Sequence, residues 1–194
     1  MSQYQGPLSG VRVVEFAGIG PGPFSGMLLA QLGADVLRID RAVADKGGSA
    51  DLLPIPEKFD LMNRGKARRA FDLKDPAAIE EVLQIVEKAD LLIEGFRPGV
   101  MERLGLGPEP CLARNPALVY GRVTGWGQTG PLAQDAGHDI TYIAPTGVLA
   151  AIGEAGGPPV PPLNLIGDLP AGRFIWSSGF WPHCSRRAAP GMVR

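Results

Sequence analysis

Two titratable side chains late in the chain stand among glycine and bulky apolar residues. His138 lies between Gly137 and Asp139, just ahead of Ile140, and Asp168 ends a run of leucine, asparagine, isoleucine and glycine. Such surroundings can move the pKa of an imidazole or a carboxylate toward neutrality, as a general acid and base working near pH 7 require. Judged by spacing alone, a single His and a single Asp more often form a core hydrogen bond and a turn. Proton transfer and a structural role are both open at this point.

Length and composition are those of one globular unit that can bury a core: 194 residues, 45% of them hydrophobic and 20% charged. The net charge of -1 gives no reason to expect nucleic acid or an anionic membrane as a partner. Cys111 and Cys184 lie outside any metal-ligand spacing, which favours a reducing compartment and neither a disulfide framework nor a metal site. With no signal-peptide pattern and no apolar run of membrane length, we expect a cytoplasmic protein.

Short β-type runs alternate with helical stretches along most of the chain. We expect strands over residues 11–16, 36–39, 67–73, 91–93 and 118–123. An apolar helix is expected over residues 24–32, ended by Gly33, and a second helix begins at Pro76, is capped by Asp75 and runs to about Lys88. This alternation is typical of an α/β fold with a parallel, Rossmann-like sheet and flanking helices.

Glycines at Gly18, Gly20 and Gly22 follow the first expected strand and invite comparison with a dinucleotide-binding turn. Pro21 and Pro23 remove two of the backbone amides that such a turn would offer to phosphate, and the spacing departs from the known fingerprint. The run therefore predicts a tight connection between a strand and a helix.

Several longer motifs surround the candidate pair. They occupy residues 13–23, 35–41, 63–66, 71–74, 96–100, 124–131, 136–142 and 161–165. Their content and order resemble those of the α-methylacyl-CoA racemases, a branch of the family III CoA-transferase superfamily. The resemblance runs from about residue 8 to residue 168. It implies the N-terminal part of that family's fold and an acyl-CoA thioester as substrate.

Basic residues gather near predicted strand ends and loops, where guanidinium groups could fork onto phosphate oxygens, although such a cluster is usually a solvated face. They are Arg38, Arg41, Arg64, Lys66, Arg68 and Arg69. The resemblance assigns CoA phosphates to Arg41 and Arg97, and the adenine end of CoA to backbone groups of Asp72 and Leu73. The full set of positions that the resemblance implies for CoA binding is Arg41, Phe71, Asp72, Leu73, Lys74, Arg97, Gly137, Asp139, Ile140, Thr141 and Tyr142.

The resemblance also implies a reaction, the racemisation of 2-methylacyl-CoA thioesters in lipid metabolism. The proton on carbon 2 must be removed while hydrogen-bond donors, such as a backbone amide near Asp139, stabilise the enolate oxygen. Inversion then needs a second acid on the opposite face of the carbon. His138 and Asp168 would occupy the two faces and exchange the roles of acid and base. No metal or redox cofactor is needed, because CoA is part of the substrate.

One alternative is a CoA-transferase of the same superfamily, in which Asp168 would be a nucleophile that forms an acyl anhydride. His138 favours the racemase branch, because the transferases commonly carry an aromatic residue at that place and need no second base. The other alternative is a non-catalytic remnant, because a sheet without its later strands would expose apolar surface.

The domain organisation departs from that of longer family members. We expect residues 1–168 to be the N-terminal part of the large CoA-binding domain and residues 169–194 to be a tail foreign to the family. The small domain, an acidic partner of the histidine and the strands that complete a homodimer in full-length members would then be absent. Activity and dimerisation of this chain are accordingly open.

The tail suggests a change of reading frame just after Asp168. When the reading frame is shifted across residues 180–184, three of the resulting codons encode leucine, alanine and leucine, whichever synonymous codons are used. These residues are typical of an apolar helix. We predict that the nucleotide sequence, read in the shifted frame from Arg173, encodes a continuous apolar helix. Stop codons or polar codons in that frame would eliminate the hypothesis.

Overall fold

The computed structural model describes residues 5–42 and 59–171 of the chain. The chain forms two compact units, residues 1–123 and residues 124–194. That the sequence after Asp168 is foreign to the family stays a prediction, because residues 172–194 lie outside the described part.

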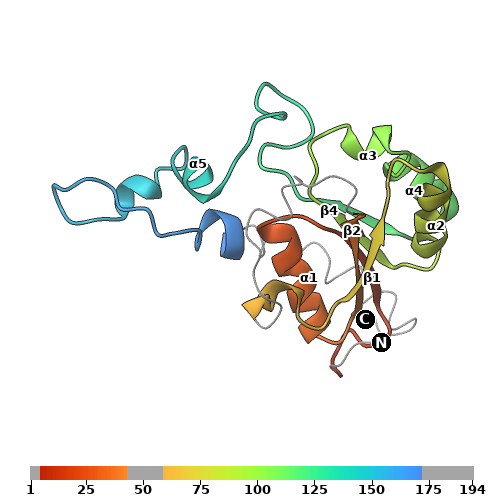
Figure 1. Cartoon of the computed structure of the whole chain (residues 1–194). Coiled ribbons are helices and arrows are strands. Elements are labelled where there is room, and N and C mark those ends of the chain that lie inside the picture. The colour runs from red at the N-terminus through yellow and green to blue at the C-terminus, as the bar shows by residue number, and fades with distance from the viewer. Residues whose placement is uncertain (1–4, 43–58, 172–194) are drawn as a thin grey trace, which may run out of the picture. The chain divides into compact units, whose positions relative to one another are not determined.

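The first unit is built on a parallel five-stranded sheet with the order β3-β2-β1-β4-β5 (Figure 1). The strands are β1 (Arg12–Phe16), β2 (Asp35–Arg41), β3 (Ala67–Phe71), β4 (Leu91–Glu94) and β5 (Val119–Arg122). They correspond to the five strands that the sequence predicts, with ends that differ by a few residues. The chain winds from β1 outward to β3 and then crosses to β4, so the strand order reverses between β1 and β4. The expected α/β fold with a Rossmann-like sheet is confirmed.

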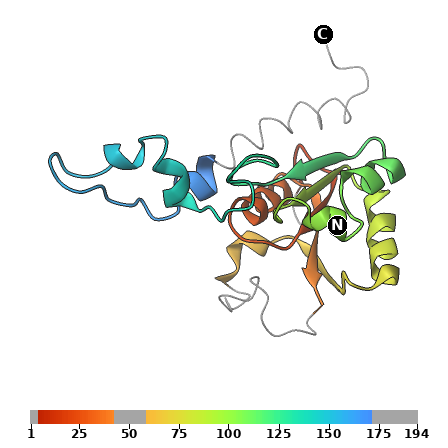
Figure 2. The same cartoon turned by 90° about the horizontal axis from the view of Figure 1, so that it is seen from above.

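Helices cover both faces of this sheet, with α1 on one side and α2 and α4 on the other (Figures 1 and 2). The helices of the first unit are α1 (Pro21–Gln31), α2 (Pro76–Val86), α3 (Val100–Arg103) and α4 (Pro108–Arg114), with a 3-10 turn η3 (Leu61–Asn63) before β3. Asp75 caps α2 as predicted, since its carboxylate accepts the amide of Ala77 at 2.9 Å. The helix α1 begins earlier than expected, because a proline is well tolerated in the first turn.

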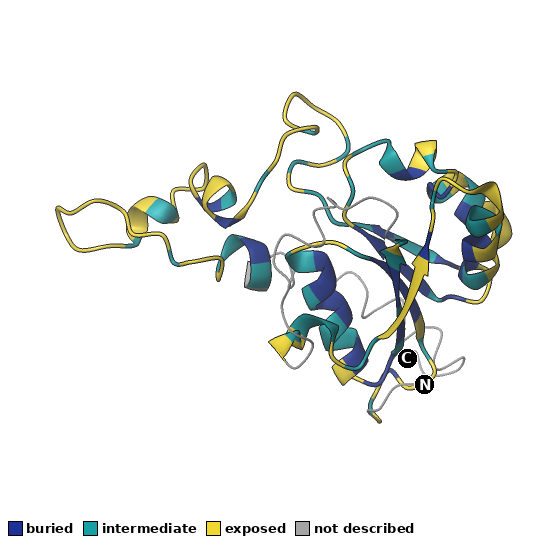
Figure 3. Cartoon of the chain, in the orientation of Figure 1, coloured by how far each residue is buried: buried dark blue, intermediate teal, exposed yellow. Residues whose placement is uncertain are grey.

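The face of the sheet that meets α2 and α4 carries the apolar core. Val14, Phe16, Ile39 and Leu92 of the strands pack there with side chains of α2, α3 and α4. Figure 3 shows these strands and the inward sides of the helices as buried. Cys111 of α4 is part of this core and fully buried, and its Sγ donates to the carbonyl of Leu106 at 3.3 Å. Burial raises the pKa of the Cys111 thiol to about 11.

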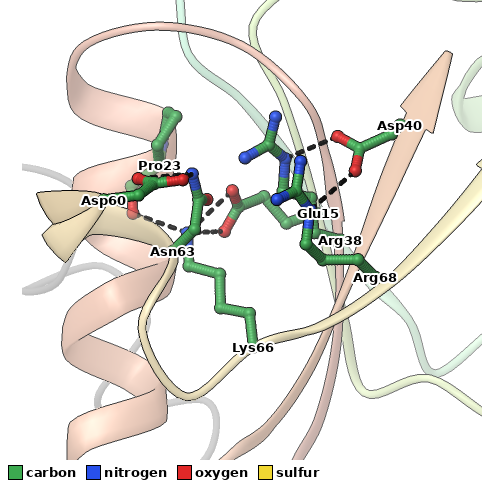
Figure 4. Close-up of polar contacts among 8 residues, drawn as sticks. All are labelled: Glu15, Pro23, Arg38, Asp40, Asp60, Asn63, Lys66 and Arg68. Carbon is green, nitrogen blue, oxygen red and sulfur yellow. Dashed lines mark hydrogen bonds and ion pairs between the residues drawn. The ribbon is translucent and has the colours of Figure 1, made fainter. Parts of the chain in front are cut away.

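The opposite face, toward α1, is unusual for a parallel sheet because it is partly charged. Glu15 of β1 lies beside Arg38 of β2, which in turn lies beside Arg68 of β3. Lys66 Nζ donates to both carboxylate oxygens of Glu15, at 2.8 and 2.7 Å, and to the carbonyl of Pro23 at 2.8 Å (Figure 4). The Glu15 and Lys66 side chains are both fully buried.

Burial has opposite effects on the two members of this pair. It raises the pKa of Glu15 to about 7, although the neighbouring Lys66 acts to lower it. It lowers the pKa of Lys66, against the pull of Glu15. A glycine makes room for the pair, since a Cβ on Gly26 of α1 would lie 1.7 Å from Glu15 Oε2. The ion pair therefore joins α1, β1 and the segment that leads into β3.

Replacing Lys66 should reveal how strongly this pair supports the fold. Lys66→Met leaves the Glu15 carboxylate buried without its partner, and we expect the free energy of unfolding to fall by about 3 to 5 kcal/mol near pH 8. The loss should shrink near pH 5. A carboxyl whose folded pKa is raised binds its proton more tightly in the folded state, so stability decreases as the pH rises through the folded pKa. Urea unfolding at both pH values measures the effect.

The matched control is Arg12→Met, which removes a half-exposed contact at 3.9 Å from Asp90 and should cost less than about 1 kcal/mol. Equal losses for the two variants near pH 8 would show that the buried pair is dispensable.

Thiol labelling tests the core itself. In a Cys184→Ser variant, we expect Cys111 to resist alkylation near pH 8 and to react only on unfolding, because the buried group stays a thiol. Mass spectrometry after iodoacetamide treatment, with and without urea, measures this. Rapid labelling without urea would contradict the described packing.

Candidate functional site

The second unit places the two candidate proton-transfer groups close together. His138 precedes the short helix α5 (Asp139–Ile143), and Asp168 lies in a single π-helical turn, η5 (Gly167–Ala171). His138 Nδ1 is 3.5 Å from Asp168 Oδ2. The imidazole is largely exposed, with 62% of the side chain accessible, whereas only 9% of the Asp168 side chain is. The pair thus combines a buried carboxylate with an imidazole that solvent or a ligand can reach.

The backbone of His138 is held in place by a local cap. Its amide donates to Thr141 Oγ1 at 2.8 Å, and the Thr141 hydroxyl donates back to the His138 carbonyl at 2.7 Å. This reciprocal arrangement satisfies backbone groups at the start of α5. Thr141, which the resemblance assigns to CoA binding, therefore uses its hydroxyl within the protein.

Tyr142 supports the loop that carries His138. Its hydroxyl donates to the Gly137 carbonyl at 2.6 Å, and its ring packs edge-on against Trp126 at 5.4 Å. Burial, together with the neighbouring Asp168 carboxylate, raises the pKa of Tyr142. Glycine is required at two positions against the ring, since a Cβ on Gly125 or Gly137 would lie 2.5 or 2.4 Å from Tyr142 atoms. Tyr142 is thus a packing residue beneath the site.

Asp139 is buried, and its side chain also points into the protein. Its Oδ2 accepts the amides of Ile166, Gly167 and Asp168, at 2.8, 2.7 and 3.1 Å. Ile140, by contrast, is 44% exposed. Within residues 137–142, Ile140 and backbone groups are therefore better placed for a ligand than the side chains of Asp139, Thr141 and Tyr142.

The remaining predicted CoA positions belong to the first unit and follow the carboxyl ends of its strands. Arg41 ends β2 beside Phe71, which ends β3, and Arg97 follows β4. Arg41 and Arg97 are exposed. Ligands of α/β sheets bind at this edge, next to the point where the strand order reverses, and here that point lies between β1 and β4.

Not every predicted position at this edge offers a side chain to a ligand. Phe71 is buried in the core, beneath the Arg69 guanidinium at 4.8 Å, and Leu73 packs against the same core. Asp72 is exposed, and its carboxylate accepts the amide of Lys74 at 3.0 Å, which orders the turn after β3. Lys74 is exposed as well.

Other basic residues of the predicted cluster have acidic partners in the protein. Lys66 is paired with Glu15, and one carboxylate, Asp40, contacts both Arg38 at 2.7 Å and Arg68 at 2.9 Å (Figure 4). These cations neutralise the carboxylates of Glu15 and Asp40 within the first unit. Gly18 and Gly20 lie in the connection from β1 to α1, as predicted, and Gly20 has a positive φ of 73° immediately before the helix. Pro21, Gly22 and Pro23 instead form the first turn of α1.

Comparison with known proteins identifies the family. A model of CoA-transferase family III matches residues 8–180. The chain belongs to CoA-transferase family III. Among the described residues of this family III chain, no helix has the length and apolar character to cross a membrane.

Family III relatives with different names resemble the chain. It is 46% identical over 172 residues to alpha-methylacyl-CoA racemase of Mus musculus, covering 89% of this chain and 42% of the racemase. It is 34% identical over 182 residues to succinate–glutarate CoA-transferase of Agrobacterium fabrum, covering 89% and 46% of the two proteins. A crystal structure of the Mycobacterium tuberculosis protein Rv3272 matches with a TM-score of 0.80 at 32% identity, covering 94% of this chain and 51% of that one. The chain spans about half the length of these relatives.

Two features of this family III site were not predicted from the sequence. The first is the close packing of Gly125 and Gly137 against the Tyr142 ring, for which the only sequence signal is the presence of the two glycines. The internal role of the Asp139 carboxylate had no such signal, because its partners are backbone amides far along the chain.

Enlarging Gly137 should disturb the support of His138. Gly137→Ala places a Cβ 2.4 Å from Tyr142 Cε1, and we expect a loss of about 1 to 3 kcal/mol in the free energy of unfolding from overpacking. Circular dichroism during urea unfolding measures this. Gly18→Ala is the control, since its Cβ meets only the Phe16 carbonyl at 3.9 Å. Equal stability of the two variants would contradict the described contact.

Proposed function

We propose that this chain interconverts the R and S forms of 2-methylacyl-CoA thioesters through an enolate, with His138 and Asp168 as the two proton-transfer groups. The observation that carries the proposal is the approach of the exposed imidazole to the buried carboxylate, at 3.5 Å. The likeness to a protein named alpha-methylacyl-CoA racemase supports it. A buried carboxylate beside a reachable imidazole suits general acid–base catalysis.

The geometry also sets a requirement for the reaction. A carbon that exchanges protons with groups on its two faces needs both within hydrogen-bond reach, and a separation of 3.5 Å leaves no room for it. Binding must therefore part the two groups. The imidazole is the partner that moves, because its side chain is 62% exposed whereas that of Asp168 is 9% exposed.

The thioester's CoA portion is the only cofactor-like group in this reaction. Arg41 and Arg97 are the proposed phosphate contacts, because they lie at the sheet edge where α/β folds bind ligands. A backbone amide at Asp139 is the proposed donor to the enolate oxygen. We further propose a cytoplasmic enzyme of lipid metabolism that needs no nucleic-acid or membrane partner, and the family resemblance implies a homodimer for full-length members.

A CoA-transferase is the second candidate. The low exposure of the Asp168 carboxylate suits a nucleophile shielded from water, and the chain resembles a protein named succinate–glutarate CoA-transferase. The two candidates differ at carbon 2, because only the racemase breaks a bond to hydrogen there.

Calorimetry tests the CoA contacts. Arg41→Ala and Arg97→Ala should each weaken CoA binding by about 1.5 to 3 kcal/mol, the range for hydrogen bonds to charged groups. Arg114→Ala, which removes contacts with Glu80 and Glu87 away from the strand ends, should leave affinity unchanged. Unchanged affinity in both of the first two variants would remove these arginines from the proposed site.

Solvent exchange tests the chemistry. In deuterated water, the chain should incorporate deuterium at carbon 2 of a 2-methylacyl-CoA while interconverting its enantiomers. His138→Ala and Asp168→Ala should each slow racemisation by on the order of a hundredfold or more. The exposed Asp135→Ala is the control and should retain the rate. Acyl transfer to a carboxylate acceptor without deuterium incorporation would favour the transferase, and a folded chain with neither activity would favour a non-catalytic protein.

A further inference from the structure

The Asp139 carboxylate makes an unusual set of contacts for an acidic residue beside a candidate site. One oxygen, Oδ2, accepts amides from the consecutive residues Ile166, Gly167 and Asp168. Asp139 is only 3% exposed. Hydrogen bonds to an ionised acceptor are shorter and stronger than neutral ones, so three on one oxygen constrain the backbone closely. The last of these amides belongs to Asp168 itself.

Close packing between α5 and η5 provides a second, independent constraint. A Cβ on Gly167 would lie 2.9 Å from the Asp139 carbonyl oxygen and 3.2 Å from Tyr142 Cβ. The backbone of the turn therefore rests directly on α5. The first amides of a helical turn lack partners within the turn, and here Asp139 supplies one.

Asp139 thereby connects the two members of the pair. It follows His138 directly in sequence, and its side chain holds the backbone of Asp168. Movement of this carboxylate would change the relative positions of the imidazole and the Asp168 carboxylate.

We infer that Asp139 is a positioning residue, whose side chain holds the Asp168 turn so that the Asp168 carboxylate faces His138. The inference rests on the proposed function of the pair, and it gives Asp139 a side-chain role distinct from the CoA contact that the family resemblance implies.

The test measures how strongly the Asp168 side chain affects the 15N resonance of His138 Nδ1. In 15N-labelled full-length chain carrying His183→Gln, His138 supplies the only imidazole signals. Replacing Asp168 by Asn should shift the His138 Nδ1 resonance at constant pH, because a neighbouring charge is removed. In an Asp139→Ala background, the same replacement should leave that resonance unchanged. Asp135→Ala, the exposed control, should preserve the full shift.

The conservative variant Asp139→Asn refines the test. Asn keeps an oxygen for the three amides but loses the charge, so we expect a response to Asp168→Asn between those of the wild-type and Asp139→Ala backgrounds. A wild-type response in Asp139→Ala would overturn the inference. If Asp139→Ala does not fold, a full wild-type response in Asp139→Asn would overturn it instead. Absence of any response in the wild-type background would also overturn it.

Solvent exchange on the same samples separates this inference from the proposed function. Asp139→Ala should lower kcat for carbon-2 exchange with little change in KM, because the substrate contacts remain while the pair is misplaced. An intact His138 response in a wild-type chain that exchanges no deuterium would reject the proposed function and retain the positioning role. Unchanged kcat in Asp139→Ala, with an active wild type, would reject the positioning role alone.

Discussion

The buried contact between Lys66 and Glu15 is the constraint on which the first unit depends. A parallel sheet normally buries apolar side chains on both faces, and here a carboxylate occupies a central strand. Burying one charge alone is very costly, so Glu15 requires a cation that reaches it without water. Lys66 meets this need from the segment before β3, and it also donates to the Pro23 carbonyl of α1. One ammonium group therefore fixes β1, α1 and the approach to the outer strand together (Figure 4).

A similar principle operates in the second unit, where a carboxylate is again buried and needs hydrogen-bond donors. There the Asp139 carboxylate is buried, and backbone amides rather than a cation satisfy it. The side chains of Asp139, Thr141 and Tyr142 each bond to backbone groups of the protein. Such internal bonding leaves few groups available for chemistry but holds those few in defined places, which is what preorganised sites require.

The contrast between racemase and transferase rests on one carboxylate that serves either reaction. Low exposure of Asp168 is compatible with a base and with a nucleophile. The imidazole differs, because only a reaction with two proton-transfer steps gives His138 an essential role. Its high exposure allows it to move when a substrate carbon enters, whereas the Asp168 backbone is held. The His138 side chain is thus freer to move than the Asp168 side chain, and the two groups also differ in chemistry.

Sequence alone determined the fold class and the pairing of candidate residues. Alternation of apolar runs with helical stretches predicted the five strands, and the Asp75-Pro76 pair predicted the start of α2, because both signals are local. The motifs identified the family before any geometry was known. Only the tertiary structure decided which charges are internal. Lys66 and Arg68 look in sequence like phosphate ligands, and their partners Glu15 and Asp40 become visible only when distant segments of the chain come together. The role of Asp139 is likewise invisible in sequence, because backbone amides carry no residue identity and come together only when η5 packs on α5.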